Sequence, residues 1–121
     1  MKIIDKIKIL GGKKLRFIVL YGSIVKGKMT ELSDIDIAIF YHDNKQERFK
    51  FRMKVLGRIA DKFDVQIFQD LPLYIQKDIV NSGEVIFYSD YKEIFNIYMK
   101  TIRDFEHFKP RLEMYYSSLG V

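Results

Sequence analysis

The stretch YGSIVKGKMTELSDIDIAIF, from Tyr21 to Phe40, is the most informative part of this sequence. It opens on Gly22-Ser23 and closes on an apolar run that begins at Asp34 and Asp36. Side chains alternate between the two faces of a β-strand, so Asp34 and Asp36 share a face and lie about 6.5–7 Å apart. Carboxylates on one face repel each other and resist desolvation, and this pair therefore needs a compensating group.

Strands and helices alternate on both sides of this stretch. Ser23 is expected to cap a short helix through about Lys28, and Ser89 or Asp90 to cap the last helix, which Pro110 should kink or divide. Apolar runs predict strands at 15–21, 34–41, 64–68 and 84–88, and helical spacing predicts helices at 1–10, 45–63, 72–83 and from about 91 onward. The pattern predicts an α+β fold, in which about four strands form a single mixed sheet with helices packed on it, and one domain spanning 1–121.

The segment 45–63 fits two patterns. Its residues 48–55, RFKFRMKV, alternate as a strand would, but the length of the segment and the continuation of its apolar spacing favour a helix. The apolar face of that helix would consist of Phe49, Met53, Leu56, Ala60 and Phe63.

Composition limits the function classes. The chain has 121 residues, no cysteine and a formal net charge of +5. The charge fits either a nucleic-acid or polyphosphate ligand or a lysine-rich surface that serves solubility. Basic residues at 48–62 are most simply a solvated helix face, so direct nucleic-acid binding is not expected. No apolar run has the length of a membrane span, and the N-terminus does not fit a signal peptide, so we expect a cytoplasmic protein without a membrane partner.

The two halves of the opening stretch suit a nucleoside triphosphate and its metal ions. Mg²⁺ prefers one or two carboxylates together with waters and substrate phosphates. Two such ions about 3.5–4 Å apart, bridged by Asp34 and Asp36, would stabilise an in-line nucleotidyl transfer. Gly22 lets the backbone approach a ligand closely, and a helix starting near Ser23 would offer its N–H groups to a phosphate. Lys26 would meet the remaining charge.

These residues resemble a known motif. Gly22-Ser23, ten intervening residues and Asp34-x-Asp36 are similar to the G-S-x10-D-x-D motif of the DNA-polymerase-β-like nucleotidyltransferases. The chain's length and its flanks LYGS and SDIDIAIF resemble the minimal nucleotidyltransferases, or MNT proteins, of archaea and bacteria. The resemblance covers roughly residues 15–88. The family often has arginine where Lys26 stands, and lysine supplies charge without a bidentate fork.

The resemblance implies a polymerase-β-like fold, with a long C-terminal helix, and a set of site residues. A third carboxylate is expected near the start of a later strand, where Asp64 matches by position and Asp61 and Asp70 are rivals. Asp34, Asp36 and Asp64 would then be the catalytic residues and would hold two Mg²⁺ ions. The phosphates of ATP would lie against Gly22, Ser23 and Lys26.

MNT proteins are commonly antitoxins whose partner is a HEPN-domain ribonuclease toxin. The resemblance therefore implies a Mg²⁺-dependent protein adenylyltransferase that moves AMP from ATP to a tyrosine of the toxin, in a hetero-oligomer. The sequence leaves no separate domain to hold the acceptor, which also favours a docking partner. One alternative is an antitoxin that only binds and masks its toxin, and another is modification of a small molecule.

Overall fold

A four-stranded sheet forms the centre of the fold, with its strands in the order β3-β2-β1-β4. This computed structural model describes residues 2–118, apart from the side chain of Tyr116. The pairs β1–β2 and β1–β4 are antiparallel and the pair β2–β3 is parallel, which confirms the predicted mixed sheet. The strands are β1 (Leu15–Tyr21), β2 (Ile35–Tyr41), β3 (Phe63–Ile67) and β4 (Glu84–Tyr88).

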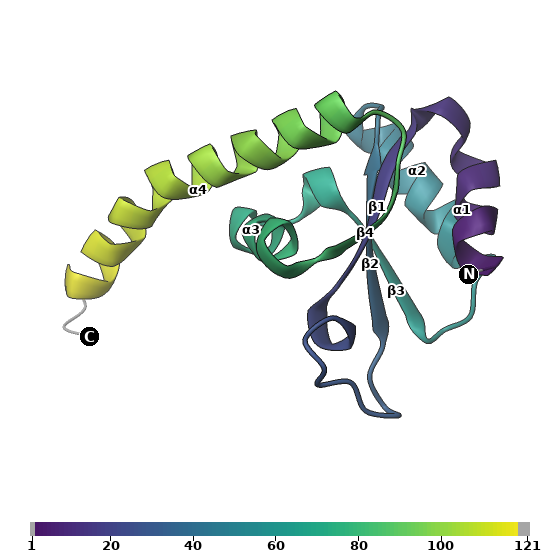
Figure 1. The fold of residues 1–121 in the computed structure, drawn as a ribbon, viewed down its shortest axis with the longest axis horizontal. Helices are drawn as coiled ribbons and strands as arrows, with labels where there is room; N and C mark the ends of the chain where they lie inside the picture. The colour runs from purple at the N-terminus through teal and green to yellow at the C-terminus, as the bar shows by residue number, and fades with distance from the viewer. Residues whose placement is uncertain (1, 119–121) are drawn as a thin grey trace.

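Helices cover both faces of this sheet. Figure 1 shows α1 and α2 on one side and α3 and α4 on the other, with α4 running away from the sheet toward the C-terminus. This arrangement confirms the predicted fold class, including the long C-terminal helix. The helices are α1 (Lys2–Gly11), α2 (Lys45–Leu56), α3 (Leu73–Ser82) and α4 (Tyr91–Ser118), and 3-10 turns lie at Gly12–Lys14, Gly22–Ile24 and Phe68–Asp70.

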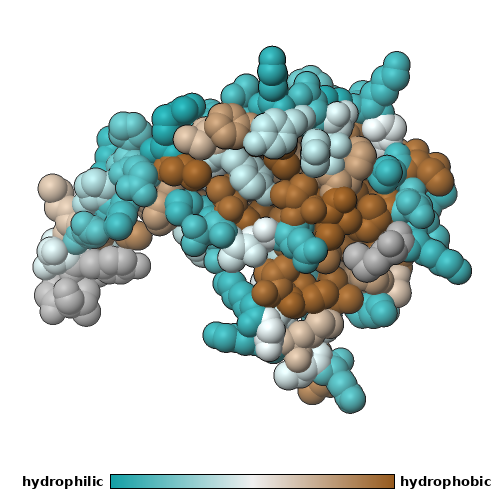
Figure 2. Space-filling view, viewed as in Figure 1, coloured by the Kyte–Doolittle hydropathy of each residue, from teal (hydrophilic) through white to brown (hydrophobic). Residues whose placement is uncertain are grey.

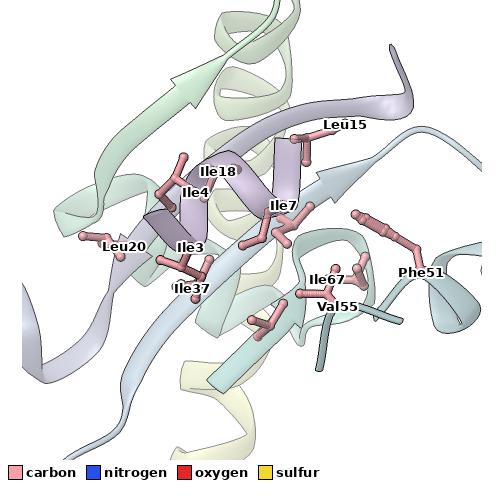
Figure 3. Close-up of a cluster of buried hydrophobic side chains, with 12 residues drawn as sticks. Ile3, Ile4, Ile7, Leu15, Ile18, Leu20, Ile37, Phe51, Val55 and Ile67 are labelled. Atoms are coloured by element: carbon pink, nitrogen blue, oxygen red, sulfur yellow. The ribbon is translucent and has the colours of Figure 1, made fainter. Parts of the chain in front are cut away.

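The sheet buries apolar side chains on both of its faces, which is why its central strands are almost continuously apolar. In β1, Ile18 and Leu20 face α1 and α2, whereas Phe17 and Val19 face α3 and α4. Figure 3 shows the first of these clusters, in which the isoleucines of α1 meet the central strands and α2. Its buried members are Ile3, Ile4, Ile7, Leu15, Ile18, Leu20, Ile37, Ile39, Phe51, Val55, Val65 and Ile67.

Helix α2 differs from its prediction in length and in orientation. It ends at Leu56, and Phe63, which was assigned to the helix, begins β3. The buried residues of α2 are Phe51 and Val55, whereas Phe49 is 59% exposed and Met53 42% exposed. The apolar spacing within 45–63 was therefore misleading, because Phe51 and Val55 are also one turn apart and it is this pair that packs on the sheet.

Helix α4 begins as predicted, since the backbone N–H of Lys92 donates to Asp90 Oδ1 over 2.9 Å. The helix does not end at Pro110 but continues to Ser118. The residues around Pro110 are exposed, so water can hydrogen-bond the carbonyl that loses its helical donor.

Figure 2 shows hydrophobic residues gathered over the middle of the viewed face and hydrophilic residues around its periphery. Within residues 2–118, no helix combines the length and the apolar character that crossing a membrane requires.

Candidate active site

Three neighbouring strands place Tyr21, Asp36 and Asp64 in one row. Tyr21 is the Cα partner of Asp36 across the β1–β2 pair, and Asp36 is the Cα partner of Asp64 across the β2–β3 pair. Direct cross-strand partners project to the same face of a sheet. This is the face covered by α3 and α4, because Ala38, two residues after Asp36, lies in the core cluster on that side.

The row is electrostatically strained. Partial burial raises the pKa of Asp36, and the negative charges of Asp64 and then Asp34 raise it further. Burial also raises the pKa of Tyr21, with Asp36 and Asp64 adding to the effect. Tyr21 and Asp36 thus resist carrying a negative charge, and a cation in the row would relieve the repulsion.

Asp64 lies where the sequence predicted the third carboxylate. It occupies the second position of β3 beside Asp36, and Gln66 Nε2 donates to its Oδ1 over 3.1 Å. The rival Asp70 lies beyond the end of β3, and its two carboxylate oxygens accept from Arg48 over 2.7 and 3.2 Å. The other rival, Asp61, is exposed in the turn before β3. Sheet register therefore brings Asp64, and neither rival, next to Asp36.

Gly22 brings the backbone against Asp36. Its φ of +76° lies in the left-handed region that favours glycine. A Cβ at this position would overlap Asp36 Oδ2, so a side chain here would displace the carboxylate. The close approach in the structure is to Asp36, and the predicted contact of Gly22 with a phosphate stays a prediction.

The predicted helix after Gly22 is absent, and this part of the interpretation was wrong. Residues Gly22–Ile24 form one 3-10 turn, whose N-cap is Tyr21 and which has no side-chain cap from Ser23. Two backbone bonds shape the turn, from Lys26 N to Gly22 O (3.2 Å) and from Lys28 N to Ser23 O (3.0 Å). So short a turn has no helix dipole with which to attract a phosphate.

Lys26 forms an ion pair with Asp78, a partner that the sequence did not reveal. Its Nζ donates to both carboxylate oxygens of Asp78 on α3, each over 3.1 Å. The segments are far apart in the chain, so no local pattern could have indicated this pair. The place of Tyr21 in the row was likewise missed, although its position at the end of a strand and directly before Gly22 was a usable signal.

The residues fit a magnesium site by their chemistry. Among residues 2–118, no group of three or more Asp, Glu, His or Cys side chains converges closely enough to hold a metal by itself. Asp34 precedes β2 and is exposed, so register joins only Asp36 and Asp64 of the expected ligands. Mg²⁺ needs only one or two carboxylates when waters and phosphates complete its coordination, and Asp36 and Asp64 satisfy that requirement.

Known proteins share this sequence and fold. The family model described as polymerase beta, nucleotidyltransferase matches residues 2–92, which include all four strands. A candidate protein adenylyltransferase of Methanocaldococcus jannaschii, MJ1547, is 37% identical over 91 residues, which cover 74% of this chain and 70% of that protein.

Two solved structures show the same fold over almost the whole chain. One is a crystal structure of a toxin-antitoxin with AMP-PNP, with a TM-score of 0.79 at 20% identity, covering 99% of this chain and 98% of that chain. The other holds a tri-AMPylated Shewanella oneidensis HEPN toxin in complex with MNT antitoxin, with a TM-score of 0.69 at 19% identity, covering 98% and 93%. The family match over residues 2–92 and the similarity to MJ1547 show that the chain belongs to the polymerase β nucleotidyltransferase family and is a nucleotidyltransferase.

Proposed function

We propose that this nucleotidyltransferase transfers AMP from ATP to a tyrosine hydroxyl of a HEPN-domain toxin, and that Mg²⁺ is required. The observation that carries the proposal is the Asp36–Asp64 pair, against which Gly22 brings the backbone. The similarity to MJ1547 supports a protein as the acceptor, and the toxin-antitoxin structures with the same fold support a toxin as the partner.

The reaction is an in-line substitution at phosphorus. The tyrosine oxygen forms a bond to the α-phosphorus of ATP, the bond from that phosphorus to the oxygen bridging the α- and β-phosphates breaks, and pyrophosphate leaves. Asp64 accepts the hydroxyl proton. When bound, Mg²⁺ neutralises charge on the phosphate oxygens and orients them.

Each site residue has a defined part in this proposal. Asp34, Asp36 and Asp64 hold the metal ions, and their mutual repulsion favours cation binding. Gly22 and Ser23 hold the β- and γ-phosphates through backbone groups and the serine hydroxyl, and Lys26 meets the remaining charge. Residues 1–121 act as one catalytic domain, while the partner supplies the surface that presents the acceptor.

The test uses the full chain, ATP labelled on the α-phosphate, Mg²⁺ and the product of the neighbouring gene. Label should appear on a tyrosine of that partner and be lost with Asp34→Asn and with Asp36→Asn. Asp5→Asn is the matched control, because Asp5 is an exposed carboxylate on α1. Toxin neutralisation that survives both site substitutions without transfer of label would contradict the proposal and favour masking by binding alone. Label found only on a small molecule would also contradict it.

A further inference from the structure

We propose that Asp78 of α3 is a positioning residue, which holds the ammonium group of Lys26 beside the turn at Gly22–Ile24 so that Lys26 can bind the triphosphate. The inference rests on the proposed function, in which that turn receives the phosphates of ATP. It adds a residue from a part of the chain that the nucleotidyltransferase motif does not include.

The geometry shows a two-oxygen contact on an accessible surface. Lys26 Nζ lies 3.1 Å from Oδ1 and 3.1 Å from Oδ2 of Asp78. The two side chains are 42% and 41% exposed, so a phosphate can reach the ammonium group without unfolding any element. Because an ammonium group has three N–H donors, the contact with Asp78 leaves at least one of them for a phosphate oxygen.

The same contact links a side chain of the segment between β1 and β2 to α3. In the part of the chain that the structure describes, no other side-chain hydrogen bond or ion pair joins residues 22–34 to a helix or strand outside the segment. The other side-chain bonds of the segment run between Thr30 and Ser33, within it. A bond to Gly22 O holds the backbone of Lys26, and Ile24 and Val25 pack on the core cluster. The position of the Lys26 ammonium group relative to the carboxylate row therefore depends on Asp78, whereas the position of its backbone does not.

Helix α3 is a suitable anchor, because it is fixed to the strand that leads into the turn. Ile79, which follows Asp78, is fully buried in the core cluster beneath α3 and α4. Gly83 closes the helix against β1, where an added Cβ would meet Val19 Cγ1 at 2.6 Å. The position of Asp78 is therefore fixed relative to β1, and so relative to Gly22, which follows β1 directly.

A lysine needs such an anchor more than an arginine does. Its ammonium group is a point charge at the end of a flexible four-carbon stem and lacks the planar fork that orients a guanidinium group on a phosphate. Fixing the ammonium group in advance lowers the conformational entropy lost when ATP binds. Asp78 therefore compensates for the lysine at position 26.

The test measures nucleotide affinity in the absence of an acceptor. Binding of ATP and of AMP, each with Mg²⁺, is titrated by calorimetry for wild type, Asp78→Asn, Asp78→Glu and Lys26→Met. The control is Asp104→Asn, which removes the carboxylate of another exposed ion pair, with Lys100 at 2.6 Å on α4. Asp78→Asn should raise the Kd for ATP by up to about fivefold, the size expected for an exposed ion pair, and should leave the Kd for AMP unchanged. Asp78→Glu, which keeps the charge, should retain most of the affinity.

The double variant separates positioning from a general structural effect. If Asp78 acts through Lys26, Asp78→Asn should add nothing in the Lys26→Met background. Three results for Asp78→Asn would overturn the positioning role and leave the proposed function intact. These are an unchanged Kd for ATP, a lower Kd for ATP, and an equal rise of the Kd for ATP and for AMP. Failure of the wild-type protein to bind ATP at all would overturn the proposed function, and the positioning role with it.

Discussion

Asp36 of β2 and Asp64 of β3 lie side by side on one face of a parallel strand pair, and the charge of Asp64 helps to raise the pKa of Asp36. Such a pair costs stability in the metal-free protein, because two carboxylates on adjacent strands repel each other. A bound cation removes the repulsion, so the stability lost in the metal-free protein is regained on binding and favours the metal-bound state. Comparing the thermal stability of the protein with and without Mg²⁺ should therefore show whether the carboxylates bind metal, and the comparison does not require that the acceptor be known.

Asp36→Asn should stabilise the metal-free protein. The substitution removes the repelled charge, and we expect the Tm in EDTA to rise by about 2–5 °C, which corresponds to a change below about 1 kcal/mol. Mg²⁺ should raise the Tm of wild type but not that of Asp36→Asn. Asp43→Asn should have the opposite sign, because a hydrogen bond from Lys14 lowers the pKa of Asp43. A lower Tm for Asp36→Asn in EDTA would contradict the proposed repulsion.

The same pair should give a pH dependence of defined sign. The pKa of Asp36 is raised in the folded state, so above the unfolded value of about 3.9 the folded protein binds more protons than the unfolded chain. The contribution of Asp36 to the free energy of unfolding should fall as the pH rises from the unfolded-state pKa to the raised folded-state pKa. Above the raised pKa it should stay constant. Urea unfolding in EDTA from about pH 3.5 to 7 should show this decline in wild type relative to Asp36→Asn. Parallel profiles would argue against it.

Asp64→Asn and Asp70→Asn should separate the third carboxylate from its rival. Loss of Asp64 should lower AMP transfer by about a hundredfold or more, as expected when the group that accepts the proton of the attacking hydroxyl is removed. Asp70 is bound by Arg48 beyond the end of β3, so its substitution should cost up to about 1 kcal/mol of stability without loss of transfer. Initial rates with labelled ATP measure the first effect and urea unfolding the second. Loss of transfer in Asp70→Asn alone would reverse the assignment.

Gly22→Ala should impair the site more than it impairs the fold. Gly22 and Gly12 both have positive φ, +76° and +56°, so alanine should cost about 1–2 kcal/mol at either position. The positions differ in surroundings, since a Cβ at Gly22 would overlap the Asp36 carboxylate whereas one at Gly12 meets nothing within 4 Å. Stabilisation by Mg²⁺ and AMP transfer should therefore be lost in Gly22→Ala and kept in Gly12→Ala. Equal behaviour of the two variants would exclude a role for the close contact.

Phe51→Ala and Phe49→Ala should test the orientation of α2. Phe51 is 5% exposed and packs against the Tyr41 ring with centroids 4.1 Å apart, so its loss should cost about 3–5 kcal/mol. Phe49 is 59% exposed, and its replacement should change stability by less than about 0.5 kcal/mol. Urea unfolding measures both. The reverse order would support the face that the apolar spacing of 45–63 had suggested.

Local patterns were enough to predict most elements of the fold. The apolar runs at 15–21 and 84–88 became β1 and β4 with the same bounds, since a buried strand and the turns around it are encoded within a few residues. The predicted helix after Gly22 proved to be one 3-10 turn, and the prediction for α2 failed where two local patterns competed. Residues 45–63 contain two sets of apolar positions at helical spacing, and only packing against the sheet selects Phe51 and Val55.

The sequence alone was enough to recognise the family, because the residue types and the spacing of Gly22-Ser23 and Asp34-x-Asp36 lie within one short stretch. Contacts in the folded chain bring together groups that lie far apart in the sequence. Sheet register set Asp64 and Tyr21 beside Asp36, and packing of α3 on β1 brought Asp78 to Lys26. The spacing at which side chains return to one face of a helix or strand is a local property of the backbone, and a short stretch of sequence can reveal it. Strand register and helix packing depend instead on contacts between residues far apart in the chain.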